Sequence, residues 1–183
     1  TGWAFKKWQL SVEKPGTGSK VKRPLKDTSN NNTMIIKTLK ALFERDLLKL
    51  RTELESYRDE RKIWYIEKEI KNPAGNLCLH LVGNLNTYIG AEIGKSGYIR
   101  NRDLEFSMRN VPRTELIGMI DRTIPIVISS LERLKDEDLE REYPLLVFAE
   151  KTSMGYMLIH LAGHLSYHLG QVNYHRRLLD GNE

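Results

Sequence analysis

The chain has little cysteine and no long hydrophobic run, and both shortages narrow the class of protein. Its one cysteine, Cys78, cannot form an intrachain disulfide, so the chain lacks the framework of a small secreted scaffold and fits a reducing compartment. The longest apolar stretch, 124–131, is interrupted by Pro125 and is far shorter than the roughly 20 residues that cross a bilayer. The first residues also lack the pattern of a secretory signal. We therefore expect a cytoplasmic protein with no membrane partner.

Positive charge is concentrated at one end of the chain. Of the 29 basic and 24 acidic residues, seven and two lie within residues 1–33, which leaves 22 of each in residues 34–183. Residues 1–33 are also rich in turn-forming residues and lack hydrophobic periodicity, so we predict a flexible basic extension. Because Met34 could be a natural start, the extension is either a native arm, a miscalled start or an expression remnant. Nucleic-acid binding by this arm ranks last among the functions considered.

Residues 34–183 are predicted to form one all-α domain. Apolar side chains recur at three- and four-residue spacing in four segments, 34–58, 73–94, 113–134 and 152–179, and this spacing is typical of amphipathic helices. Asn72 and Pro73 are expected as N-cap and first residue of the second helix, and Pro125 is expected to kink the third. Residues 58–71 and 95–112 are interpreted as connections. Four long helices predict an antiparallel four-helix bundle, with a long crossover between helices 2 and 3.

Histidine is concentrated in the last predicted helix, which contains four of the five: His160, His164, His168 and His175. Steps of four residues keep the first three on one stripe of a helix. They cannot all bind one ion, because His160 and His168 would lie about 12 Å apart along the axis, whereas zinc–nitrogen bonds are about 2.1 Å long. An adjacent pair can chelate, but spacing alone does not choose between 160/164 and 164/168.

A third ligand must come from elsewhere, and His80 is the one histidine outside that helix. Three histidines would give a neutral ligand set with a position left open for water or substrate. A lone histidine on a helix is more often a hydrogen-bonded core residue, so the interpretation depends on the cluster. Next to Arg176 and Arg177, His175 is interpreted as a cation at the negative end of the helix dipole, and Cys78 as a core residue.

Other polar residues could assist such a site. Asn84, Tyr167 and Gln171 are placed to orient a ligand or to touch a metal-bound water, although structural hydrogen bonding explains each equally well. The charged link could bind an anionic group of a substrate, although charged loops are more often merely solvated. Its candidates for that role are Arg100, Asn101, Arg102 and Asp103.

Two motifs together resemble the DinB/YfiT-like superfamily over about residues 34–181. They are His160-Leu-Ala-Gly-His164-Leu-Ser-Tyr-His168-Leu-Gly170-Gln171 and Asn76-Leu-Cys-Leu-His80-Leu-Val-Gly-Asn84-Leu-Asn86, and residues 97–103 resemble an uncharacterised branch of that group. The resemblance implies a four-helix bundle with a divalent metal, zinc or nickel, at one end, and a homodimer in many members. It also implies His80, His164 and His168 as the ligands, with His160 beside them.

The resemblance further implies a class of reaction, because characterised relatives include metal-dependent transferases that act on low-molecular-weight thiols. We expect an enzyme that activates a thiol or water, with a small-molecule thiol or electrophile as substrate. The histidine motif contains no carboxylate that could act as a general base, which favours thiol S-transfer over hydrolysis. The alternative is a non-catalytic metal-binding or stress-response bundle in which the metal is structural.

Overall fold

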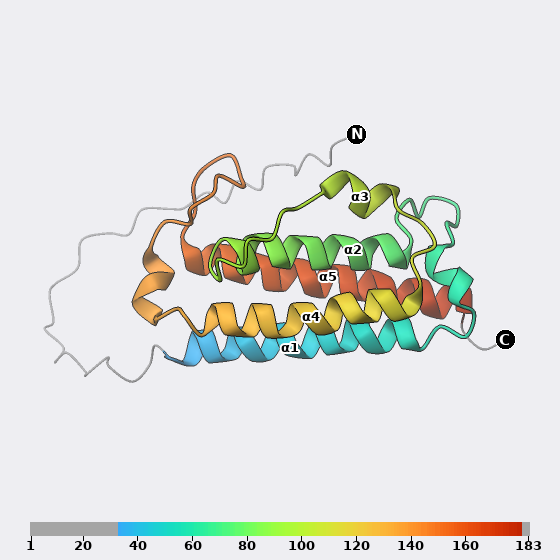
Figure 1. Cartoon of the computed structure of the whole chain (residues 1–183), viewed down its shortest axis with the longest axis horizontal. Helices are drawn as coiled ribbons and strands as arrows, with labels where there is room; N and C mark the ends of the chain where they lie inside the picture. The colour runs from blue at the N-terminus through green and yellow to red at the C-terminus, as the bar shows by residue number, and fades with distance from the viewer. Residues whose placement is uncertain (1–32, 181–183) are drawn as a thin grey trace, which may run out of the picture.

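A computed structural model describes residues 33–180, and Figure 1 shows their arrangement. Within that range the secondary structure is helical apart from one isolated bridge between Glu142 and Ser153, so the all-α prediction is confirmed there. The predicted basic extension lies outside the described residues, except for Thr33. Among the helices of this range, none is both long enough and apolar enough to traverse a bilayer.

Four helices run side by side along the long axis in Figure 1: α1 (Thr33–Glu55), α2 (Ala74–Leu85), α4 (Arg113–Leu131) and α5 (Met154–Asp180). Helix α1 packs against α4 and α5, and α2 packs against the same two helices. The apolar stripe of α1 explains this arrangement, because its members at three- and four-residue spacing are all buried. These members are Leu39, Phe43, Leu47, Leu50 and Leu54.

Helix α2 is buried on every side, because all of its residues from Ala74 to Leu85 are buried. Helices α4 and α5 cover two of its faces and the crossover covers a third. A polar side chain on such a helix needs a partner, since an unpaired buried polar group costs about 1–3 kcal/mol. His80, Asn76 and Asn84 all lie on this buried helix.

The ends of α2 differ from the prediction. Pro73 is the N-cap rather than the first helical residue, and the exposed Asn72 lies outside the helix. The predicted single helix 73–94 is α-helical only as far as Leu85 and continues as a π-helical segment, η2 (Asn86–Ala91). The Asn86 side chain fixes this change by donating to the Val82 carbonyl at 2.9 Å and to the Thr123 hydroxyl at 2.8 Å.

The crossover contains a short helix that the sequence prediction missed. Helix α3 (Arg102–Ser107) is preceded by Asn101, whose side chain accepts a hydrogen bond from the Leu104 amide and so caps the helix. Figure 1 places α3 on the outer side of α2, away from α1 and α4. The crossover therefore brings its charged residues to α2.

The remaining connections contain two 3-10 turns, η1 (Glu60–Trp64) and η3 (Asp136–Glu140). The first lies in the segment interpreted as a connection, packs against α2 and α5, and buries Ile63 and Trp64. Helix α4 starts directly after Pro112 and, as expected, is not ended by Pro125.

Candidate metal centre

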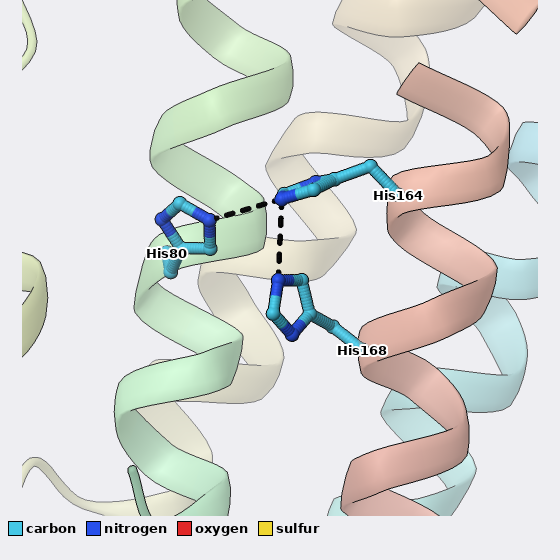
Figure 2. A group of neighbouring side chains, drawn as sticks. All are labelled: His80, His164 and His168. Atoms are coloured by element: carbon cyan, nitrogen blue, oxygen red, sulfur yellow. Dashed lines mark hydrogen bonds between the residues drawn. The ribbon is translucent and has the colours of Figure 1, made fainter. Parts of the chain in front are cut away.

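Three histidine rings converge between α2 and α5, and Figure 2 shows their nitrogens turned toward one another. Nε2 of His164 lies 3.3 Å from Nε2 of His80 and 3.2 Å from Nε2 of His168. One nitrogen from each of the three rings lies within 4.8 Å of the others. The structure therefore brings together the three histidines that the sequence singled out as ligands.

The spacing of these nitrogens fits a common metal. Two ligand nitrogens at the corners of a tetrahedron, each about 2.0–2.1 Å from a central zinc ion, are about 3.3 Å apart. The two separations along the His80–His164–His168 series are 3.3 and 3.2 Å. Imidazole nitrogens also suit nickel, copper and iron. The donor set fits a divalent ion of this kind.

In His80 and His168 the outer ring nitrogen, Nδ1, already has a hydrogen-bond partner, which bears on the tautomer of each ring. Nδ1 of His80 lies 3.0 Å from the Glu105 carboxylate, and Nδ1 of His168 lies 2.6 Å from the Gln171 side-chain oxygen. The nearest partner of each Nδ1 is an acceptor, which favours the tautomer with the proton on Nδ1 and a lone pair on Nε2. Nη2 of Arg100 also lies 3.3 Å from Nδ1 of His80, but it is closer to Oε2 of Glu105, at 2.8 Å, and donates there. Nε2 of His164 lies within hydrogen-bond distance of Nε2 of both His80 and His168, so either a proton or a cation can occupy the space between the rings.

Burial keeps the ring of His164 neutral. Burial lowers its pKa from 6.5 to about 3, with further lowering by His168 and His80. Burial also lowers the pKa of His168, against an opposing contribution from Gln171. A neutral imidazole is the form that binds a metal, because the ligand nitrogen must be unprotonated. The Nδ1 of His164 is buried and has no hydrogen-bond partner among residues 33–180.

Glu105 of α3 is a site residue that the sequence prediction missed. Its buried carboxylate contacts His80 and is held by Arg100, whose Nε lies 2.6 Å from Oε1 and whose Nη2 lies 2.8 Å from Oε2. Burial acts to raise the pKa of Glu105, but hydrogen bonds from Arg100 and His80 outweigh it and hold the pKa below its ordinary value. The available signal was a carboxylate in a charged crossover, since metal-binding histidines commonly donate to one.

Gly83 makes room for that carboxylate. A Cβ placed on Gly83 would lie 2.1 Å from Oε1 and 2.8 Å from Cδ of Glu105, far inside contact distance. Gly83 lies three residues after His80, on the same side of α2. The glycine therefore allows Glu105 to reach His80.

His160 lies beside the group of three converging histidines and is not part of it. Its ring stacks on His164 with 6.1 Å between centroids and meets Phe148 edge-on at 4.8 Å. Burial lowers the pKa of His160 below its ordinary value. The ring is a neutral neighbour of the three converging nitrogens.

The three polar residues predicted to flank the site differ in burial: Tyr167 and Gln171 are exposed, whereas Asn84 is buried. Gln171 contacts His168, and its amide nitrogen donates to the exposed Tyr167 hydroxyl at 3.3 Å, so both lie at the edge of the site. Asn84 is buried one turn after His80, and its side-chain oxygen has no partner within the described part of the chain.

The charged residues of the crossover also separate into two groups. The Arg100 guanidinium turns inward to Glu105 and lies 5.7 Å from the centre of the Tyr88 ring, so it is committed to the protein interior. Arg102 is exposed and lies over the Phe106 ring, which in turn packs against His80. Asp103 is exposed on the same short helix, and Asn101 serves as its cap.

The interpretation of His175 as a cation at the helix end is wrong. Its side chain is buried, with Nδ1 2.6 Å from the Tyr57 hydroxyl and Nε2 3.0 Å from the Tyr65 carbonyl oxygen. Burial lowers the pKa of His175, which favours the neutral ring. It joins α5 to the connection after α1 and contributes nothing to the cluster.

An all-helical protein with three histidines placed to bind a metal ion is the class that this fold and this site define. The chain belongs to a family described as a protein of unknown function (DUF1572), whose sequence profile matches residues 30–183. A search of curated proteins gave no match.

Proposed function

We propose that the protein is a divalent-metal protein of the DinB/YfiT-like four-helix-bundle kind, which binds zinc or nickel through His80, His164 and His168. The observation that carries the proposal is the convergence of three Nε2 atoms, two of whose separations match the edge of a tetrahedral site. The side-by-side packing of α1, α2, α4 and α5 supports the bundle, and α3 would lie on its long crossover.

A divalent ion held by three histidines keeps a coordination position open and lowers the pKa of a thiol or water that binds there. Neighbouring side chains orient the imidazole rings that would bind the ion. Glu105 and Gln171 hold the rings of His80 and His168 with their lone pairs inward, and Phe106 packs beside His80. His164 and His168 are half-buried rather than fully buried, which supports access by a small molecule.

We favour transfer of a thiol sulfur to an electrophilic carbon over hydrolysis. Glu105 is the carboxylate nearest to the cluster among the contacts described above, and it is occupied by Arg100 and His80, with its pKa held low. Such a carboxylate is a poor general base for an attacking water. A thiol, once deprotonated, needs no further base. Arg102, exposed over Phe106, is a candidate to bind an anionic group of the substrate.

We also propose a homodimer, as the resemblance implies. Helix α5 carries exposed aromatic and aliphatic side chains along its length, which supports an interface on that helix. They are Tyr156, Ile159, Tyr167, Tyr174 and Leu178. Light scattering on the purified protein would give the mass, and a monomer at micromolar concentration would contradict the dimer.

Metal content tests the site directly. Elemental analysis of untagged protein should find close to one zinc or nickel ion per chain, and His80→Ala or His168→Ala should lose it. His160→Ala is the matched control, because it removes a histidine one turn from the cluster and should keep the ion. An absence of metal from the wild-type protein after incubation with zinc or nickel would overturn the proposal.

Turnover tests the reaction. The metal-loaded protein should consume low-molecular-weight thiols in the presence of electrophiles, and His164→Ala should abolish this. Stoichiometric metal without turnover against a broad thiol and electrophile panel, together with strong stabilisation by the ion, would favour the alternative of a structural metal in a non-catalytic bundle.

A further inference from the structure

Helix α3 is attached to α2 by a small set of contacts that centre on the histidine site. The Asn76 side-chain amide donates to the Glu105 carbonyl at 2.7 Å and to the Met108 carbonyl at 3.0 Å. Glu105 is the one fully buried residue of α3. Asp103 and Leu104 of the same helix are exposed and make no such contact with α2.

The attachment and the site share one side chain. Glu105 accepts a hydrogen bond from Nδ1 of His80 at 3.0 Å, and Arg100 holds both of its oxygens. Phe106 adds a ring packed 5.1 Å from the His80 ring centroid. Whatever keeps α3 in place therefore also keeps Nδ1 of His80 on Glu105 and its Nε2 directed at His164.

We propose that Glu105 is a positioning residue that fixes the tautomer of His80 and couples the docking of α3 to metal binding. This inference rests on the proposed function, since the ion is the one expected at His80, His164 and His168. Coupling between two equilibria is reciprocal. If docked α3 strengthens metal binding, then the metal strengthens the docking of α3 by the same factor.

The tautomer can be observed without any metal. Long-range nitrogen–proton NMR spectra of the metal-free protein should show His80 protonated at Nδ1 in the wild type. Glu105→Ala should bring in the tautomer protonated at Nε2. Glu105→Gln keeps an oxygen that can accept from Nδ1 and should restore the wild-type tautomer, which a purely steric role would not explain.

Two further measurements use zinc as the probe. Glu105→Ala should weaken zinc binding about 10- to 100-fold, the usual effect of removing the partner of a ligating histidine, as measured by competition with a chelator. Zinc should also slow hydrogen exchange at the amides of residues 104–108 in the wild type, and this slowing should disappear in Glu105→Ala.

Asp180→Ala provides the matched control. Asp180 is also a buried carboxylate, held by the Arg58 amide and Lys62, but it lies about 18 Å farther along α5 than His168. Its removal should destabilise the chain while leaving the His80 tautomer and the zinc affinity unchanged. It separates a general loss of stability from a specific effect.

A substitution at Gly83 tests the same role of Glu105 without replacing Glu105 itself. Gly83→Ala should displace the carboxylate and weaken zinc binding nearly as much as Glu105→Ala, because the added methyl overlaps Glu105. In the Glu105→Ala background the same glycine change should have almost no further effect on affinity. Additive losses in the double variant would overturn the proposal.

The failure of this inference is distinguishable from failure of the proposed function. Wild-type protein without zinc affinity contradicts the metal site. Wild-type affinity together with an unchanged His80 tautomer and unchanged zinc affinity in Glu105→Ala contradicts the role of Glu105 alone.

Discussion

At the scale of single residues, the site depends on buried rings whose pKa is lowered, above all that of His164. The ring of His164 has a pKa of about 3 because of burial and neighbouring rings, whereas exposed histidine titrates at 6.5. Metal ligands must be unprotonated, and this environment supplies that form well below neutral pH. The same property makes the stability of the metal-free protein depend on pH.

We predict that the free energy of unfolding of the metal-free protein falls as the pH is lowered from about 6.5 toward about 3. In this window the unfolded chain binds a proton at His164 that the folded chain does not, so acid favours unfolding. The unfolding free energy of His164→Gln should fall less steeply with decreasing pH. The difference between the two slopes should correspond to at most one bound proton. Urea denaturation of both proteins across the pH range measures the difference, and identical slopes would contradict the buried, neutral ring.

A separate prediction concerns the stability contribution of His175, which lies outside the site. His175→Ala should lower the free energy of unfolding by about 2–4 kcal/mol, because it leaves a cavity and removes the partner of the buried Tyr57 hydroxyl. Its zinc content should stay at the wild-type level. Arg177→Lys, at an exposed position two residues farther along α5, should change stability by no more than about 0.5 kcal/mol. Equal effects of the two changes in denaturation would show that His175 is not a packing residue.

The site residues were predictable to different degrees for physical reasons. Four-residue spacing on one helix offered two chelating pairs, 160/164 and 164/168, since such pairs share a face, and the family resemblance selected the second. His80 followed from the scarcity of other histidines together with its motif. Glu105 was missed because it reaches His80 through tertiary contact, with no fixed spacing along the chain. His175 was misjudged because the sequence shows the adjacent arginines but not the tertiary contact with Tyr57, 118 residues away.

At the scale of elements, apolar periodicity located α1, α4 and α5 to within a few residues, because each buries one side and exposes another. Helix α2 is buried all round, so no change of pattern marks its transition to a π-helix at Asn86. The six residues of α3 are too few for a periodic signal. The capping role of Asn101 was its one local indication.

Glycines within the helices should respond oppositely to the same substitution. Gly163 of α5 has open space around it, so Gly163→Ala should raise the free energy of unfolding by about 0.5–1 kcal/mol through higher helix propensity. Gly75→Ala should instead lower it by about 1–3 kcal/mol, because the methyl would lie 2.6 Å from the Trp64 ring. Chemical denaturation of the two variants gives both signs, and a shared sign would contradict the packing of η1 on α2.

At the scale of the whole molecule, the site joins parts of the chain that are far apart in sequence. His80 and His164 are separated by 84 residues, so an ion bound by both links α2 to α5 across the crossover and α4. Such an ion binds the folded state in preference to the unfolded one. Stability should therefore increase with the concentration of free metal.

We predict that zinc at 100 times its dissociation constant raises the free energy of unfolding by about 2.7 kcal/mol. His80→Ala should remove this dependence, while His160→Ala should retain it. Urea denaturation at a series of buffered zinc concentrations provides the measurement. A zinc-independent midpoint for the wild type, or a dependence that survives in His80→Ala, would contradict the site.

Cys78 has a practical consequence for any assay of thiol transfer. It is the single cysteine of the chain, it is fully buried in α2, and burial raises its pKa to about 12. A thiolate is the reactive form, so the folded protein offers almost no thiol of its own to an alkylating or chromogenic reagent. Disappearance of free thiol in such an assay would report the cosubstrate alone, and one cysteine introduced at an exposed position such as Ile99 could be labelled without competition.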